Sequence, residues 1–370
     1  MARLGDVCEI LDGKRVPVTA ADRQPGPYPY YGANGVQDYV ADYIFDDELV
    51  LLAEDGGNFG SKDKPIAYRV SGKCWVNNHA HVLKPKQGLD VDYLCYSLMF
   101  YDVSGLVNGA TRQKLTQADM RKMEIPLPPL EEQRRIAALL DKVSDLIAKR
   151  RAQLDKLDLL VKARFVEMFG DLKRNTKNWE NLRFDDCFDI TSSKRILKSE
   201  WKSTGIPFLR VRDMVQLATN GKMNSEFFVS EEYYATLSDS DGMPAEGDIL
   251  VSATSTLGKC YIVKKGERFY FKDADVLRFR AKRNINPVFF IELMKTDYIK
   301  EQILKTLGVT TVAHFTIKAA KTIHLRFPDL NIQNQFAAFV EETDKSKLTI
   351  QQSLDKLEIL KKALMQQYFG

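Results

Sequence analysis

The sequence has few cysteines, no long apolar run and no leader-like start, and each absence excludes a class of protein. Only five of its 370 residues are cysteines; they are odd in number and form no Cys-x-x-Cys pair, which is typical of reduced thiols in a cytoplasmic protein. The longest apolar runs, such as 49–53, contain about five residues, whereas a membrane-spanning helix needs about 20. The first residues lack the apolar core of a signal peptide. We therefore expect a cytoplasmic protein without membrane contact.

Motifs for catalysis and phosphate binding are also absent. No GxGxxG follows a predicted strand, and the sequence contains no GxxxxGK[ST] loop. It lacks the Asn-Pro-Pro-aromatic motif of amino-methyltransferases and the nuclease signature in which Pro-Asp is followed by Glu-x-Lys. His79 and His81 share one face of a probable strand, but no third metal ligand is evident, so we expect structural or surface histidines and no metal site. The sequence therefore predicts a chain that is not an enzyme by itself.

The chain repeats itself. Residues 123–170 align without a gap with residues 323–370, and 14 of the 48 positions are identical. Two such long matching segments within one chain indicate an internal duplication. The preceding regions match more loosely, and the alignment places residues 80–83 over 274–277. The predicted layout is globular, helical, globular, helical.

Both repeated segments are predicted to be long helices of about 38 residues, because apolar residues recur at alternating spacings of four and three. This spacing is the heptad pattern of a coiled-coil seam. Each helix could pack on its own domain, or the two copies could pair antiparallel as a fused pseudo-two-fold dimer, which the duplication favours. The predicted pairing residues are Ile136, Leu140, Val143, Ile147, Leu154, Leu157 and Val161 in the first helix, and Phe336, Val340, Ile350, Leu354, Leu357 and Leu364 in the second.

The globular regions are mixed in secondary structure and rich in strands. Residues 49–53 and 248–252 are predicted to be buried strands, whereas 92–101 and 287–298 have helical spacing. The predicted boundaries give a first globular domain at 1–122, a helix at 123–170, a linker at 171–182, a second globular domain at 183–322 and a second helix at 323–370.

Local basicity is the main chemical signal. Lys and Arg (54) exceed Asp and Glu (50) by only four, but residues 257–283 carry nine basic residues against three acidic ones. Lys and Arg neutralise phosphates, and Arg, Asn, Gln and Thr can read base edges. The alternative is a solvated basic surface. The candidate nucleic-acid contacts are Lys14, Arg15, Asn34, Asn58, Lys62, Lys64, Arg112 and Gln113 in the first half, and Lys194, Arg195, Arg210, Arg212, Thr254, Thr256 and Lys259 in the second.

Several motifs resemble one known family. Residues 124–136, Glu-Ile-Pro-Leu-Pro-Pro-Leu-Glu-Glu-Gln-Arg-Arg-Ile, resemble the start of the conserved helical region in specificity subunits of type I restriction–modification systems. Residues 109–115 resemble the segment before it, and 30–35 and 77–81 resemble patterns common in the target-recognition domains of that family. The resemblance covers essentially the whole chain, because the two-fold layout matches as well.

This resemblance implies an α+β fold in which two pseudo-symmetric globular target-recognition domains are separated by two long helices that pair as an antiparallel coiled coil. Each domain would read half of a split, asymmetric site in the major groove of double-stranded DNA. Two modification (methyltransferase) subunits would dock along the helices and methylate adenine with S-adenosylmethionine. Restriction (motor-nuclease) subunits would cleave unmethylated DNA with ATP and Mg. The chain itself would hold no cofactor and would not catalyse.

Two alternatives stay open at this stage. The partner could be a fused methylase–nuclease in place of separate subunits, since that difference lies in the partner's sequence. The chain could also be a coiled-coil scaffold that binds no nucleic acid, which would explain the helices but not the duplicated basic loops.

Overall fold

The computed structural model describes residues 1–109, 113–237, 242–307 and 314–370. The chain divides into two compact units, which we call unit 1 (Met1–Gln153 with Ile350–Gly370) and unit 2 (Leu154–Thr349). Each unit mixes helices with a mainly antiparallel sheet, so the predicted α+β class is confirmed. Among the described residues, no helix combines the length and apolarity needed to cross a membrane.

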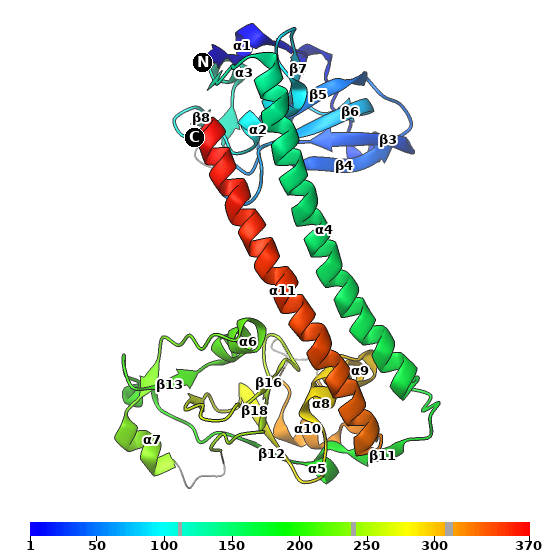
Figure 1. Cartoon of the computed structure of the whole chain (residues 1–370), viewed down its shortest axis with the longest axis vertical. Coiled ribbons are helices and arrows are strands. Elements are labelled where there is room, and N and C mark those ends of the chain that lie inside the picture. Colours follow the sequence, from blue (N-terminus) through cyan, green and yellow to red (C-terminus); the bar gives the residue numbers. More distant parts are fainter. Residues whose placement is uncertain (110–112, 238–241, 308–313) are drawn as a thin grey trace. The chain divides into compact units, whose positions relative to one another are not determined.

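Unit 1 is built on a six-stranded sheet with the order β2-β7-β5-β6-β3-β4 (Figure 1). Neighbouring strands are antiparallel except β3 and β6, which are parallel. The strands are β2 (Cys8–Ile10), β3 (Pro25–Gly32), β4 (Gly35–Val40), β5 (Phe45–Ala53), β6 (Ala67–Val76) and β7 (Ala80–Pro85). Two small pairs, β1 (Ala2–Arg3) with β10 (Glu124–Ile125) and β8 (Val107–Asn108) with β9 (Lys114–Leu115), and the helices α1 (Leu4–Val7), α2 (Val91–Met99) and α3 (Gln117–Met120) complete the globular part.

Unit 2 repeats this architecture with a divided sheet. One part has the order β12-β18-β15-β16 and the other has the order β14-β13-β17, in which β13 and β17 are parallel. Its strands are β11 (Glu180–Arg183), β12 (Phe188–Ser192), β13 (Ile206–Leu209), β14 (Phe228–Val229), β15 (Ile249–Ser252), β16 (Cys260–Ile262), β17 (Tyr270–Phe271), β18 (Val276–Ala281) and β19 (His324–Phe327). Its shorter helices are α5 (Phe184–Cys187), α6 (Val211–Asn220), α7 (Glu231–Leu237), α8 (Pro287–Met294), α9 (Asp297–Thr306) and α10 (Ile317–Thr322).

The two topologies correspond strand for strand if β16 and β17 together take the place of β6. Strand register also fixes which residues correspond. Ile10 lies opposite Leu83 in unit 1, and Ile190 lies opposite Phe279 in unit 2. Leu83 therefore corresponds to Phe279, and the sequence alignment of 80–83 with 274–277 was wrong by two residues. The error arose because the turns before these strands differ in length, which sequence similarity over four residues could not detect.

The two long helices are α4 (Leu130–Phe169) and α11 (Leu330–Phe369), with 40 residues each. Residues 123–129 and 323–329 precede them and contain β10 and β19, so the repeated segments are not helical throughout. The predicted helix 287–298 was also wrong as one element. It is divided into α8 and α9, because the Thr296 hydroxyl accepts a hydrogen bond from the Ile299 N–H and caps a new helix.

Segments of both long helices meet within each unit. In unit 1, Arg151 of α4 forms an ion pair with Glu358 of α11, with 2.7 Å between Nη2 and Oε1. In unit 2, Phe165 of α4 packs edge-on against Phe336 of α11, and Lys347 of α11 lies 2.7 Å from Asp158. In unit 1 Arg135 also interacts with Tyr368, so in both units the residue numbers rise along one helix as they fall along the other, and the segments are antiparallel. The alternative in which each helix packs only on its own domain is therefore wrong.

The structure places every predicted pairing residue on a covered face. All thirteen apolar residues are buried or half-buried, and so are the interrupting Arg150, Arg164, Lys347 and Lys361. Two buried aromatic residues that the heptad seam did not include, Phe165 and Phe169, join the core of unit 2. Helical spacing thus located the covered face, and the additional aromatic residues widen it next to the globular part.

Candidate nucleic-acid interface

Both units gather loops at the same edge of the sheet, where the two parallel strands end. In unit 1 the Asn77 N–H donates to the Tyr31 carbonyl at 3.0 Å, and in unit 2 the Lys272 N–H donates to the Leu209 carbonyl at 2.9 Å. We call this the loop edge. It comprises residues 11–15, 33–34, 54–65, 77–79 and 113–115 in unit 1, and residues 192–195, 210–212, 253–259, 272–275 and 314–315 in unit 2.

The loop edge contains the candidate contacts predicted from the sequence. In unit 1, Lys14, Lys62, Lys64 and Gln113 are exposed, and Asn58 is half-buried. Asn34 donates its side-chain amide to the Gly56 carbonyl at 3.0 Å and so joins two of the loops. Arg112 lies outside the described residues. In unit 2, the exposed candidates are Lys194, Arg195 and Thr256, and the half-buried ones are Thr254 and Lys259.

Among the candidate nucleic-acid contacts, Arg15 is held by partners within unit 1. Its guanidinium turns inward, where Nη1 lies 2.6 Å from Glu54 Oε2 and donates to the Ala80 carbonyl at 2.7 Å. A cation held by buried partners cannot approach a phosphate without breaking these bonds.

Arg210 and Arg212, at the start of α6, also form ion pairs within unit 2. Arg210 donates to Asp213 at 3.1 Å and to Glu226 at 2.9 Å, and it is only half exposed. Arg212 is exposed but forms an ion pair with the same Glu226. Both residues therefore stabilise the start of α6, and a DNA contact from either would compete with Glu226.

Many of the basic residues in the run 257–283 are neutralised by acidic partners in the folded chain. Five of its nine cations form ion pairs, namely Arg268, Lys272, Arg278, Arg280 and Arg283. Arg278 is buried in the unit, and Arg280 Nη2 lies 2.8 Å from Asp248. The partner of Lys272, Asp275, lies within the run, but the other acidic partners, Glu180, Asp189, Glu231 and Asp248, come from other segments, so a local count of charge could not reveal most of the compensation.

Sequence reasoning missed a cavity beside the loop edge of unit 1. The cavity has a volume of about 410 Å³, and its lining includes Arg23, Gln37, Asn77, Asn78 and His79. Asn77 fixes this wall, because its Nδ2 donates to Gln37 Oε1 at 3.1 Å and its Oδ1 accepts the His79 N–H at 2.8 Å. Only the family resemblance of residues 77–81 pointed to this segment, since Gln37 comes from a different hairpin.

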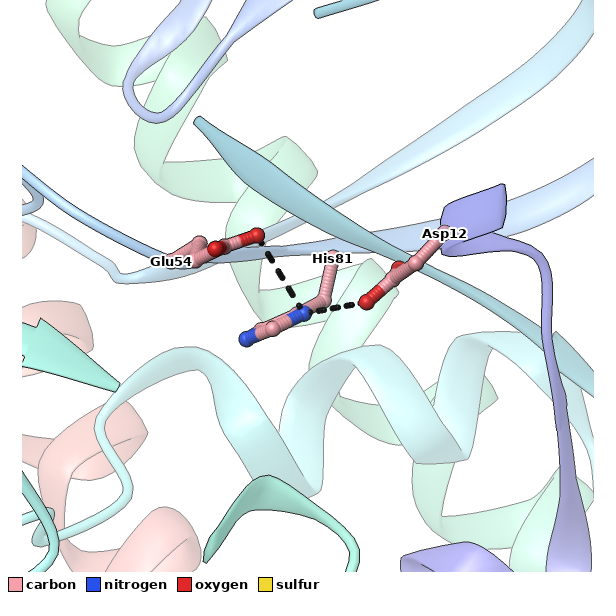
Figure 2. Close-up of side chains that lie close together, drawn as sticks. All are labelled: Asp12, Glu54 and His81. Atoms are coloured by element: carbon pink, nitrogen blue, oxygen red, sulfur yellow. Dashed lines mark hydrogen bonds and ion pairs between the residues drawn. The ribbon is translucent and has the colours of Figure 1, made fainter. Parts of the chain in front are cut away.

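A second missed feature is a buried cluster of charge behind the same edge (Figure 2). His81 has no exposed surface, and its Nδ1 lies 2.6 Å from Asp12 Oδ2 and 3.7 Å from Glu54 Oε2. The other ring nitrogen, Nε2, lies 2.9 Å from the Leu115 carbonyl. We call Asp12, Glu54 and His81, together with Arg15, the charge network. The sequence did not identify Asp12 and Glu54 as partners of His81, because they lie 69 and 27 positions away along the chain.

Protonation follows from these partners. Burial raises the pKa of Asp12, but the hydrogen bonds from His81, Gln117 and the Val82 N–H outweigh it, so the pKa is held below its ordinary value. Asp12 is therefore a carboxylate at neutral pH. Both ring nitrogens of His81 lie within hydrogen-bond distance of an oxygen, Nδ1 of Asp12 Oδ2 and Nε2 of the Leu115 carbonyl.

The charge network is suited to internal ion pairing rather than to a metal. The ligand atoms of Asp12, Glu54 and His81 lie within 4.8 Å of one another. However, both ring nitrogens of His81 already lie within hydrogen-bond distance of protein oxygens, at 2.6 Å and 2.9 Å, so a metal would have to displace one of these contacts. Arg15 and Lys114 already supply cations to Glu54, at 2.6 Å and 3.0 Å.

Comparison with known proteins agrees with this architecture of a duplicated sheet domain and a long helix. The family model for the type I restriction modification DNA specificity domain matches residues 1–157 and 176–359. A putative type I restriction enzyme specificity subunit of Haemophilus influenzae is 32% identical over 279 residues, which are 74% of this chain and 70% of that protein. A type I specificity subunit of Methanocaldococcus jannaschii is 24% identical over 99% of this chain and 90% of its own length.

Solved structures show the same fold. The S subunit of a type I restriction–modification system from M. genitalium has a TM-score of 0.62 at 15% identity, covering 100% of this chain and 95% of that chain. A chain from a structure of the type I R-M system, described by its complex assembly and conformational transition, has a TM-score of 0.55 at 17% identity, covering 100% and 96%. The chain therefore belongs to the type I restriction modification DNA specificity family. This membership agrees with the interpretation of the sequence as a specificity subunit and not with the scaffold alternative.

Proposed function

We propose that this chain is the non-catalytic specificity subunit of a type I restriction–modification system and that it reads a split, asymmetric DNA site. In this proposal the target-recognition domains are residues 1–122 and 183–322, and the helical spacers are 123–170 and 323–370. The observation that supports it is the loop edge, which occurs twice on the same topology but carries different side chains. One backbone frame with two sets of side chains suits two different half-sites.

One turn of the loop edge illustrates the difference between the two sets of side chains. Between the end of β6 and the start of β7 the sequence is Asn-Asn-His, at 77–79, whereas between β17 and β18 it is Lys-Asp-Ala-Asp, at 272–275. Amide side chains pair well with adenine in the major groove, and carboxylates accept from cytosine. Two turns with different donors and acceptors would select different bases, so the full site would not be a palindrome.

Exposed cations near these turns would supply affinity without sequence information. Lys62 and Lys64 lie on the β5–β6 loop of unit 1, and Lys194 and Arg195 follow β12 in unit 2. Contacts between Lys or Arg and phosphates release counterions and make binding fall steeply with salt. Because both units would bind one DNA molecule through a single chain, their separate affinities would reinforce each other.

The partners follow from the same proposal. The pairing of α4 with α11 would set the gap between the half-sites and offer two related surfaces to two modification subunits. Those subunits would methylate adenine with S-adenosylmethionine, and restriction subunits would use ATP and Mg to cleave unmethylated DNA. This chain would contribute recognition and assembly alone.

Selection of DNA from a random library tests the proposal. The chain, assembled with its modification subunits, would be used to capture duplexes that contain a long randomised segment, and the captured DNA would be sequenced. We expect two short, different motifs separated by a fixed number of unspecified base pairs. Capture without any enriched motif, or capture that does not weaken with salt, would contradict the proposal.

A further inference from the structure

The charge network ties one short segment of unit 1 to the sheet. This segment is residues 114–117, and it lies directly after the exposed Gln113. The Leu115 N–H donates to the Glu54 carbonyl at 2.7 Å, and the Leu115 carbonyl accepts from His81 Nε2 at 2.9 Å. Both polar groups of the Leu115 backbone are thus held by the network.

Side chains of the same segment are held as well. Lys114 Nζ lies 3.0 Å from Glu54 Oε1, and Gln117 Nε2 donates to Asp12 Oδ2 at 2.9 Å. The network therefore binds residues 114, 115 and 117 through both carboxylates and the ring of His81. Little rotation of this segment is possible while these bonds persist.

In unit 2 the positions that correspond to Asp12, Glu54 and His81 carry uncharged residues. Strand register and the shared backbone bonds pair Asp12 with Ser192, Glu54 with Ala253 and His81 with Leu277. Here the Phe315 N–H donates to the Ala253 carbonyl at 2.8 Å, as Leu115 does to Glu54. Ala253, Leu277 and Phe315 are fully buried.

The comparison shows that the fold does not need the charges. In unit 2 buried apolar residues hold the same backbone arrangement together. Replacing a buried ion pair by apolar residues is often neutral or stabilising. The charged residues instead fix the orientation of the segment they bind, because hydrogen bonds between charged groups restrict geometry more narrowly than apolar contacts do.

We propose that the charge network of Asp12, Glu54, His81 and Arg15 is a positioning device that holds Gln113 at the loop edge for recognition of one half-site. The inference rests on the proposed function, since it assumes that the loop edge reads DNA. His81, Asp12 and Glu54 are positioning residues, because they are buried and act through the segment 114–117. Unit 2 holds its loop edge without such a device, so the dependence on charge is confined to one half-site.

The repeat itself supplies the test variant. The triple substitution D12S/E54A/H81L gives unit 1 the residues that unit 2 carries at the same positions. The full chain would be expressed with its modification subunits, and methylated sites would be mapped for wild type and variant. We expect the variant to keep a split motif and to lose discrimination in one half-site by about tenfold or more, the scale of one lost base contact. The variant K194A/R195A, in unit 2, identifies the other half-site by weakening it.

Two further variants keep the result interpretable. E54Q preserves the shape of the side chain but weakens its bonds to Arg15 and Lys114, so it should relax the same half-site to a smaller extent even if the triple variant does not fold. D47N removes the ion pair of Asp47 with Lys84, at the opposite end of β5, and should leave both half-sites unchanged.

The outcomes separate the two proposals. An unchanged motif in the folded triple variant or in E54Q, with only a lower melting temperature, would overturn the positioning role and leave the proposed function intact. Equal relaxation of both half-sites would also overturn it. Absence of any split motif with the wild-type chain would instead refute the proposed function.

Discussion

Gln133 accepts a hydrogen bond from the backbone N–H of Asp90, with 2.9 Å between N and Oε1. The glutamine lies in the first turn of α4 and is fully buried, and its Nε2 donates to the Pro128 carbonyl at 2.8 Å. Two hundred residues later Gln333 makes the same two bonds, to the Asn286 N–H and the Pro328 carbonyl. The duplication has therefore kept the joint that fixes the start of each long helix to the cap of a neighbouring helix.

Truncation of this joint should destabilise unit 1. Gln133→Ala leaves the Asp90 N–H and the Pro128 and Gly88 carbonyls without their partner, and each unsatisfied buried group costs roughly 1–3 kcal/mol. We expect a clear fall in the melting temperature measured by calorimetry. Glu131→Ala, at an exposed position of the same turn, is the matched control and should change stability by less than about 0.5 kcal/mol.

Two neighbouring residues of α4 should differ sharply in their contribution to stability. Phe165 is buried and contacts Phe289 and Phe336, whereas Val166 is 60% exposed. Phe165→Ala should cost about 3–5 kcal/mol through lost burial and a residual cavity, and Val166→Ala should be nearly neutral. Denaturant unfolding of the two variants measures the difference, and similar losses would show that α4 is not packed as described.

Acid should remove the contribution of Asp12. Its pKa is lower in the folded chain than its ordinary value, so the carboxylate stabilises the fold above the unfolded pKa of about 3.9, and this stabilisation is lost as the pH falls below that value and through the lower folded pKa. Asp12→Asn should therefore melt below wild type at pH 7, with the two melting temperatures converging as the pH falls through the folded pKa of Asp12. A constant difference in melting temperature from pH 7 to pH 3 would show that the Asp12 pKa is not lowered by folding.

Exposed lysines on the β5–β6 loop should set part of the salt dependence of DNA binding. In Lys62→Ala and Lys64→Ala, the slope of log K against log salt should decrease in magnitude by about 0.9 for each lost phosphate contact. Fluorescence anisotropy with a duplex that contains the site measures this slope. Lys122→Ala is the control, because Lys122 forms an ion pair with Asp119 outside the loop edge. Equal slopes in all three variants would place the DNA elsewhere.

Much of the fold was predictable because helical periodicity and duplication are local signals. The spacing of Ile136, Leu140 and Val143 identifies a covered helix face whatever covers it, and Phe-Gly at the end of both segments marks the register of the repeat. The first helix begins after Pro129 as expected, since proline is tolerated only at the start of a helix.

The site was less predictable because its chemistry depends on residues distant in sequence. Arg15 belongs to a basic pair in the sequence, but Glu54 and the Ala80 carbonyl, 39 and 65 positions away, turn it inward. The partner of His81, Asp12, is likewise distant in sequence, 69 positions away. Local charge counts point to loops that carry Lys and Arg, but they cannot separate cations that face solvent from cations that form ion pairs inside the fold.

Mapping of methylated adenine tests the central claim most directly. The chain would be expressed with its modification subunit in a host without other adenine methylation, and N6-methyladenine would be located by single-molecule sequencing. We predict two short, different half-sites at one fixed separation, with methylation in both. A continuous motif would contradict recognition by two units, and absence of adenine methylation in an assembled complex would contradict the assignment as a specificity subunit.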